Sequence, residues 1–271
     1  MPAVYCATCG AQFAPAEAPP PGCPVCEDPR QYVPESGQRW VAPEELAAAH
    51  RVVLRPEGDY TGVGLEPDFA IGQRALLVPL AGGRLMWDCV PYAGVAGAAE
   101  VERDGGVAAI AISHPHYYTG MVEWARRFGC RVLLHAADAE WIMRPDPVVE
   151  LWDGDTLELE DGVTLIRAGG HFAGGTILHD ARTRALLAGD IVQVIPDRRH
   201  VGFMYSYPNL IPLAPEAVER IAAALAPYAF ETVYGAWWDR VVRRDGSAVV
   251  RRSAERYVRA VRGEWPVRTR S

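Results

Sequence analysis

Three histidines and one aspartate, each placed shortly after a run of strand-forming residues, are the residues of this sequence best suited to chemistry. They occur in the strings Ser113-His114-Pro115-His116, Gly169-Gly170-His171 and Gly189-Asp190. Neutral imidazole nitrogen and carboxylate oxygen suit zinc or iron, and a site that keeps an open position can do chemistry. We therefore predict that His114, His116, His171 and Asp190 bind one catalytic metal ion, zinc or iron, and that Asp190 belongs to the catalytic machinery.

Four cysteines near the N-terminus form a second candidate metal site. The pairs Cys6/Cys9 and Cys23/Cys26 are both Cys-x-x-Cys, and the stretch 14–22 between them is rich in proline and alanine. Such a segment has no core of its own, but four thiolates bind a closed tetrahedral zinc whose binding energy can fold it. We predict a zinc-ribbon-like module over residues 1–40 with one structural zinc. Iron is the alternative, because the pattern is similar to that of rubredoxins, although Glu27 stands where a second rubredoxin glycine is expected.

The elements that must position the histidines and the aspartate lie in residues 41–271, predicted to be a second domain. Here short apolar runs alternate with amphipathic segments, which is typical of an α/β fold. The predicted strands are 75–78, 84–87, 108–112, 131–134, 163–166, 176–178 and 185–187. The predicted helices are 120–128, 215–225 and 253–262, the last capped by Ser253. Since strand ends are rigid yet open to a cleft, several of them can converge on one ion.

Length and charge set the wider limits. A chain of 271 residues that is 49% apolar can form one sizeable domain and a small appendage. No apolar run is long enough for a membrane span and the first residues do not resemble a secretion signal, so we expect a cytoplasmic protein with reduced thiols. The net charge of −7 argues against a nucleic-acid partner. We expect a small-molecule substrate, no membrane partner, and a protein contact or homo-oligomer through the cysteine module.

The order His-x-His, Gly-Gly-His and Gly-Asp, each after a strand, resembles the metallo-β-lactamase superfamily, which includes glyoxalase II, over about residues 52–262. The resemblance implies an αββα sandwich with a cleft at one edge. The string Trp87-Asp88-Cys89 is similar to the family's strand-end aspartate, which implies that Asp88 orients the first histidine loop from behind the metal ligands.

The sequence departs from the two-metal members of that superfamily. They have an aspartate and a histidine where this chain has Tyr118 and Thr119, and a late histidine where it has Ala236. A second metal would thereby lose its private ligands, whereas the first set is complete. We therefore predict a mononuclear site.

One metal ion is sufficient for several reactions. Zinc lowers the pKa of bound water to about 7, which permits hydrolysis of an ester, thioester or lactone. Tyr118 is a poor general base but can donate a hydrogen bond to a developing oxyanion, and we predict it to be catalytic. The first alternative is a mononuclear iron oxidoreductase similar to the persulfide dioxygenases. The second is a non-enzymatic scaffold that retains a degenerate site.

Two aromatic segments are predicted to line the substrate pocket. The stretch 203–212 combines aromatic residues and prolines with one amide, and it follows Asp190 by about one loop. Within it, Tyr205 and Asn209 offer polar contacts to a substrate. Trp237 lies beside the position of the missing histidine, so we expect it to make the pocket less polar than in two-metal relatives.

Overall fold

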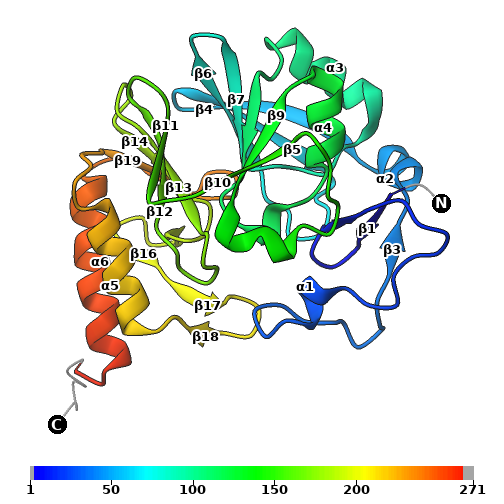
Figure 1. Cartoon of the computed structure of the whole chain (residues 1–271). Coiled ribbons are helices and arrows are strands. Elements are labelled where there is room, and N and C mark those ends of the chain that lie inside the picture. Colours follow the sequence, from blue (N-terminus) through cyan, green and yellow to red (C-terminus); the bar gives the residue numbers. More distant parts are fainter. Residues whose placement is uncertain (1–2, 265–271) are drawn as a thin grey trace.

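The computed structural model describes residues 3–264, so the outer ends of both predicted domains lie beyond the described residues. Two β-sheets lie face to face, and helices cover the outer face of each (Figure 1). An apolar cluster is buried between each sheet and the helices that cover it, and a third cluster is buried between the two sheets. The architecture is the αββα sandwich that the sequence predicts.

The first sheet has seven strands in the order β10-β9-β8-β7-β6-β5-β4. Their bounds are β4 Arg51–Glu57, β5 Tyr60–Glu66, β6 Ala75–Leu80, β7 Gly83–Trp87, β8 Ala109–Ala111, β9 Arg131–His135 and β10 Val149–Trp152. Successive side chains of a strand point to opposite faces. In β6, Leu77 therefore packs toward the helices α2 (Pro43–Ala49), α3 (Gly94–Arg103) and α4 (Met121–Phe128), while Leu76 and Val78 pack between the sheets.

The second sheet has six strands in the order β11-β12-β13-β14-β19-β20. They are β11 Thr156–Glu160, β12 Val163–Arg167, β13 Thr176–Asp180, β14 Ala185–Leu187, β19 Thr232–Tyr234 and β20 Val241–Val242. The helices α5 (Pro215–Leu225) and α6 (Gly246–Val261) cover its outer face through residues such as Val218 and Val250. Between β14 and α5 lie two small hairpins, formed by β15 (Gln193–Val194) with β16 (Val201–Gly202) and by β17 (Met204–Ser206) with β18 (Ile211–Pro212).

The N-terminal module is a three-stranded sheet, β2-β1-β3, with one short helix. Its elements are β1 Val4–Cys6, β2 Gln12–Phe13, α1 Pro24–Glu27 and β3 Trp40–Val41. The pairing of Val41 with Tyr5 carries this sheet across the predicted domain boundary at residues 40 and 41. The loop after α1 runs beside the β17–β18 hairpin (Figure 1).

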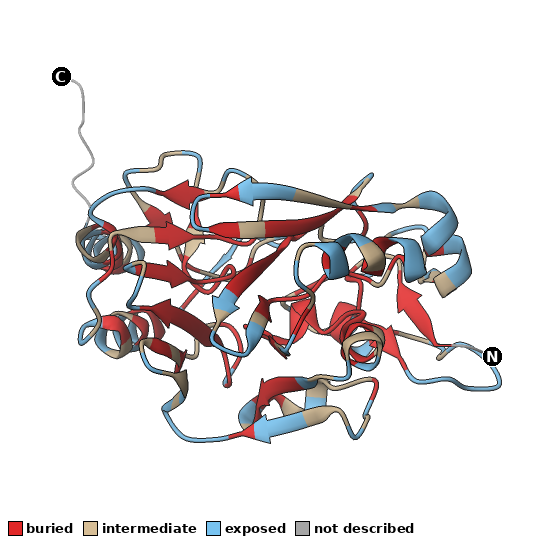
Figure 2. Cartoon of the chain, turned by 90° about the horizontal axis from the view of Figure 1, so that it is seen from above, coloured by how far each residue is buried: buried red, intermediate tan, exposed pale blue. Residues whose placement is uncertain are grey.

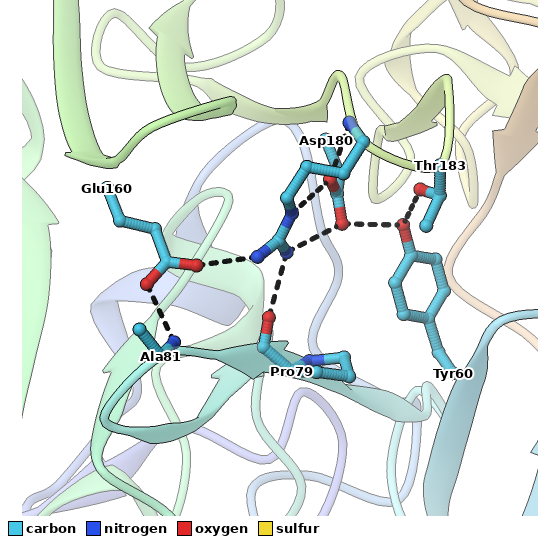
Figure 3. Close-up of polar contacts among 7 residues, drawn as sticks. Tyr60, Pro79, Ala81, Glu160, Asp180 and Thr183 are labelled. Carbon is cyan, nitrogen blue, oxygen red and sulfur yellow. Dashed lines mark hydrogen bonds and ion pairs between the residues drawn. The ribbon is translucent and has the colours of Figure 1, made fainter.

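A polar network joins the two sheets. Arg182, in the turn after β13, donates to the carboxylates of Asp180 and Glu160 and to the backbone oxygen of Pro79 in the first sheet. Tyr60 contacts Asp180 from β5, and Figure 3 shows these groups converging from both sheets. Arg182 lies in the turn before the start of β14, whereas Asp190 follows the other end of β14. The network and Asp190 are therefore at opposite ends of this strand.

The predicted strands all form, and so do the predicted helices, but one boundary is wrong. The last helix begins at Gly246, not at Ser253. Ser253 is 2% exposed inside α6, and its hydroxyl accepts a hydrogen bond from the backbone N–H of Val201. It therefore anchors the helix to the β15–β16 hairpin and does not cap it.

Burial follows the layers. Figure 2 shows buried residues concentrated in the strands and exposed residues on the outer sides of the helices. Within the described residues, no helix combines the length and apolar character that a membrane span requires.

Candidate metal centre

The four predicted ligands of the catalytic metal meet at one end of the sandwich. His114 and His116 follow β8 of the first sheet, whereas His171 and Asp190 follow β12 and β14 of the second. One ligand atom of each lies within 4.8 Å of those of the other three. Oδ1 of Asp190 is 3.2 Å from Nε2 of His114 and 3.7 Å from Nε2 of His171.

The atoms that face one another lack hydrogen-bond partners. Nε2 of His114, His116 and His171 and Oδ1 of Asp190 are all buried, and none of them makes a hydrogen bond within the described structure. Leaving buried polar atoms unpaired costs about 1–3 kcal/mol each, so such a cluster needs an explanation. One divalent cation would satisfy all four atoms, and three imidazoles with one carboxylate suit zinc or iron.

A tight approach between two loops holds Asp190 in place. Gly189 has φ +55°, in the left-handed region, and a Cβ there would lie 2.7 Å from the hydroxyl oxygen of Ser113. Any side chain at position 189 would therefore push the Asp190 loop away from the histidine loop.

A chain of hydrogen bonds orients His114 from behind. Asp88, which follows β7, accepts from the backbone N–H of Ser113 at 2.8 Å, and the hydroxyl of Ser113 is 2.9 Å from Nδ1 of His114. With a cation bound at Nε2, Nδ1 would carry the ring proton and would donate it to the serine hydroxyl. Asp88 thus acts on the first histidine through Ser113.

Burial keeps the imidazoles neutral, as metal ligation requires. It lowers the pKa of His114 and His116 well below the ordinary value, with the neighbouring His171 adding to the effect. The pKa of His171 is lowered to about 3, first by burial and then by the charge of Arg30. Burial and the nearby Asp88 carboxylate raise the pKa of Asp190 to about 7, and a bound cation would favour its ionised form.

The four cysteines form a separate buried cluster in the module. Sγ of Cys6 lies 3.5 Å from that of Cys26, and Sγ of Cys9 lies 3.7 Å from that of Cys23, so each pair contributes one sulfur to each contact. Gly10, with φ +81°, turns the chain after Cys9 and donates to the Cys6 carbonyl. This arrangement is suited to a tetrahedral thiolate site for zinc or iron.

A pocket of about 190 Å³ opens onto His116, His171 and Asp190. Apart from His116, His171 and Asp190, its lining residues are uncharged: Thr8, Gln31, Tyr32, Ala70, Ile71, Tyr205, Tyr207, Pro208 and Trp237. Thr8, Gln31 and Tyr32 come from the N-terminal module, so the module forms part of the pocket wall.

The predicted pocket residues have different positions. Tyr205 and Trp237 line the pocket, and the indole of Trp237 also donates to the Ile71 carbonyl. Asn209 is not among the lining residues, because its amide donates to the carbonyls of Pro29 and Gln31. It binds the module and not the cavity.

Tyr118 is buried in the core of the first sheet and does not line the pocket. Its catalytic role stays a prediction. Two other tyrosines lie closer to the ligands: the hydroxyl of Tyr207 donates to the backbone oxygen of Asp190, and that of Tyr117 lies close enough to the Asp190 carboxylate to lower its pKa.

Few groups are available to hold a second ion beside the first. Thr119 and Ala236, which the sequence resemblance places where two-metal enzymes have histidines, are both buried. Among residues 3–264, the groups of three or more potential ligands are the two described above.

Comparison with known proteins places the chain in a family. It is 42% identical to the uncharacterized protein YmaE of Bacillus subtilis, over 97% of this chain and 98% of that protein. The chain belongs to the YmaE family. No family model matches it. YmaE is described as uncharacterized, so membership of the YmaE family assigns no activity.

The fold of this YmaE-family chain is that of the metallo-β-lactamases. The metallo-β-lactamase DIM-1 has a TM-score of 0.58 at 13% identity, over 78% of this chain and 98% of the enzyme. FIM-1 from Pseudomonas aeruginosa, solved in its mono-zinc form, has a TM-score of 0.57 at 13% identity, over 77% of this chain and 96% of its own. Sequence identities this low establish the fold alone.

Sequence reasoning does not identify several groups around the site. Ser113 stands directly before His114, and this adjacency is the signal that could have revealed it. Arg30, whose guanidinium donates to the His171 carbonyl at 2.7 Å, is 141 positions away in the chain, and no local pattern marks it.

Proposed function

We propose that this chain is a metal-dependent hydrolase that uses a single ion. The ion would be bound by His114, His116, His171 and Asp190, here called the His/Asp site. The observation that carries the proposal is the set of four buried ligand atoms without hydrogen bonds, which come from both sheets. Three of the four residues, His116, His171 and Asp190, line a pocket. The replacement of the second set of ligands by Tyr118, Thr119 and Ala236 supports a single ion.

Zinc bound there would supply Lewis acidity, which polarises a carbonyl and lowers the pKa of water to about 7. The residues of the chain position this chemistry. His114 is held by Ser113, and Asp190 is held by the close approach at Gly189. Asp190 would hold the ion from the second sheet with its carboxylate, opposite the histidines that follow β8.

The pocket supports a small neutral substrate. A cavity of about 190 Å³ holds only a compact molecule, and its lining has no cationic side chain to pair with a substrate carboxylate or phosphate. Aromatic rings of Tyr32, Tyr205 and Trp237 offer apolar contact, and Gln31 and Thr8 offer hydrogen bonds. An uncharged ester, thioester or lactone fits this description.

The test combines metal analysis with turnover. Purified protein is assayed for zinc and iron, and for hydrolysis of small neutral aryl esters, thioesters and lactones, alongside His171→Ala, Tyr118→Phe and the control His50→Gln. We expect one equivalent of zinc to be lost in His171→Ala together with hydrolysis, while His50→Gln keeps both. A loss of hydrolysis without loss of zinc in Tyr118→Phe would support its oxyanion role.

Three results would overturn the proposal. Iron in the His/Asp site with oxygen uptake on a thiol would favour the dioxygenase, and a second equivalent in that site would contradict a single ion. A metal-loaded protein inert toward all three substrate classes would favour the scaffold.

A further inference from the structure

The segment that follows the cysteine-bearing helix α1 reaches the His/Asp site directly. Arg30 lies four residues after Cys26, and its side chain is only 12% exposed. One guanidinium nitrogen, Nη1, donates to the backbone oxygen of His171 at 2.7 Å. Cys26 of the cysteine cluster is thus connected to His171 through four residues of the chain and one hydrogen bond.

The guanidinium is fixed on its own side by a rigid turn. Nε and Nη2 donate to the two carboxylate oxygens of Asp28 at 2.6 and 2.9 Å. Asp28 in turn donates its backbone N–H to Pro24 in α1, and its carbonyl accepts from Gln31. The position of the Arg30 side chain therefore depends on the position of the helix that carries Cys26.

Aromatic rings enclose the guanidinium where it meets the histidine loop. Its central carbon lies 3.9 Å from the ring centroid of Phe172, the neighbour of His171, and 4.8 Å from that of Trp141. Such cation–π contacts strengthen when they are desolvated. The loop that carries His171 is thereby held by a hydrogen bond and by stacking.

The β17–β18 hairpin holds the same segment from the opposite side. The hydroxyl of Ser206 donates to the carbonyl of Arg30, and the amide of Asn209 donates to those of Pro29 and Gln31. Three consecutive carbonyls are thus bound, which fixes Gln31 and Tyr32 in the pocket wall.

We propose that Arg30 is a positioning residue of the His/Asp site, and that the four-cysteine site acts through it. When the cysteine cluster is ordered by its own metal, Arg30 holds the His171 loop in its ligating position and Gln31 and Tyr32 complete the pocket. Loss of the cysteine-bound metal then weakens metal binding at the His/Asp site. This inference rests on the metal-binding part of the proposed function and not on hydrolysis.

The test measures the metal affinity of the His/Asp site in Arg30→Met, Arg30→Lys and Arg39→Met. Arg39 is an exposed arginine of the same module and provides the matched loss of charge. Co²⁺ is the probe, because thiolate and imidazole sites give different visible spectra, and a competing chelator supplies the affinity. Circular dichroism and the thiolate spectrum confirm that each variant is folded with its cysteine site loaded.

We expect Arg30→Met to weaken Co²⁺ binding at the His/Asp site by about 10- to 100-fold, the usual effect of removing a group that orients a ligand. Arg30→Lys should fall in the same range, since an ammonium cannot bind Asp28 and the His171 carbonyl in a fork. Arg39→Met should stay within about twofold of the native protein. A folded Arg30→Met protein with native affinity would overturn the positioning role.

A double-mutant cycle tests whether the cysteine site acts through Arg30. Cys23→Ser alone should weaken the His/Asp site at least as much as Arg30→Met, and the double variant should add little to either. Full additivity would show that the two sites act independently and would refute the coupling. Because Co²⁺ affinity is the readout, these outcomes do not depend on finding a substrate.

Discussion

The hydrogen bond between Ser113 and His114 determines which imidazole nitrogen faces the cation. With Ser113→Ala, Nδ1 of this fully buried histidine loses its partner, and the ring is free to adopt the wrong tautomer. We expect about a 10- to 100-fold weaker zinc affinity at the His/Asp site, measured by chelator competition. Ser36→Ala, at an exposed position of the module, is the control and should not differ from the native protein. An unchanged affinity in Ser113→Ala would show that the Ser113 hydroxyl does not orient the ligand.

A buried acid beneath the His171 loop makes stability depend on pH. Burial raises the pKa of Asp138 to about 6, even though the backbone N–H of Gly174 donates to its carboxylate at 2.7 Å. Between the unfolded value near 4 and about 6, the folded chain holds a proton that the unfolded chain has released, so this residue lowers stability as pH rises. Its contribution amounts to at most about 3 kcal/mol.

The isosteric variant Asp138→Asn separates this effect from other titrations. It keeps an acceptor for Gly174 and removes the charge. Urea unfolding at pH 4.5 and pH 7 should show that the variant gains more stability over the native protein at pH 7 than at pH 4.5, where only part of the destabilisation has developed. An equal difference at both values would mean that Asp138 does not hold a proton in the folded state.

Among the single residues of the site, the sequence predicts those that are marked by their immediate neighbours in the chain. The candidate metal ligands stand in short strings after strands, so residue type and position are sufficient to predict the cluster that the structure brings together. Asn209 is different, because its amide is directed to the module by hydrogen bonds to the carbonyls of Pro29 and Gln31, which are 180 and 178 positions away in the chain. Arg30 has no local signal for the same reason.

Strand β5 has two glycines on one face, and both leave room for an aromatic ring. A Cβ at Gly62 would lie 2.4 Å from the indole of Trp238, and one at Gly64 would lie 2.7 Å from it. Trp238 therefore packs flat on the strand, next to Trp237 in the pocket wall. We expect Gly62→Ala to destabilise the fold by about 1–3 kcal/mol, the usual cost of overpacking.

Thermal unfolding of Gly62→Ala and Gly82→Ala checks this expectation. A Cβ added at Gly82 would meet no atom within 4 Å, so the same extra methyl should there change stability by less than about 0.5 kcal/mol. If the two variants unfold alike, the indole does not constrain the strand.

The same glycines explain why β5 is absent from the predicted strands. The string Tyr60-Thr61-Gly62-Val63-Gly64 has the glycine content of a loop, and glycine is depleted in strands. Only the tryptophan, far along the chain, makes these positions favourable in a sheet. By contrast, α5 keeps a regular apolar spacing and forms over the predicted range, Pro215–Leu225.

For the whole molecule, the alternation of apolar runs and amphipathic segments is sufficient to predict the α/β class, and the resemblance to the metallo-β-lactamase superfamily implies the sandwich. The packing of the module could not be predicted, because it depends on backbone carbonyls that bind Ser206 and Asn209. The end of the sandwich far from the metal site could not be predicted either, since Arg182 there resembles any other surface arginine.

Arg182 should contribute measurably to the association of the sheets. Asp180 is fully buried, and although burial acts to raise its pKa, the hydrogen bonds and charge of Arg182 hold that pKa below the ordinary value. Arg182→Met leaves this carboxylate without its cation, and we expect a loss of about 1–3 kcal/mol in the free energy of unfolding. Metal affinity should not change, because this network lies at the opposite end of β14.

The control for Arg182 is an exposed ion pair of the first sheet. Arg131 faces Glu150, both more than half exposed, and Arg131→Met should cost less than about 1 kcal/mol. Equal losses in the two variants, measured by urea unfolding, would show that the network does not hold the sheets together.

The chain passes from the seven-stranded sheet to the six-stranded one through the exposed residues 153–155, between β10 and β11. A cut at this crossing would leave His114 and His116 on one polypeptide and His171 and Asp190 on the other. The two pieces would then be complementary fragments of a single coordination sphere, and their recombination would be driven by zinc. A split version of this protein would therefore report free metal as fragment assembly.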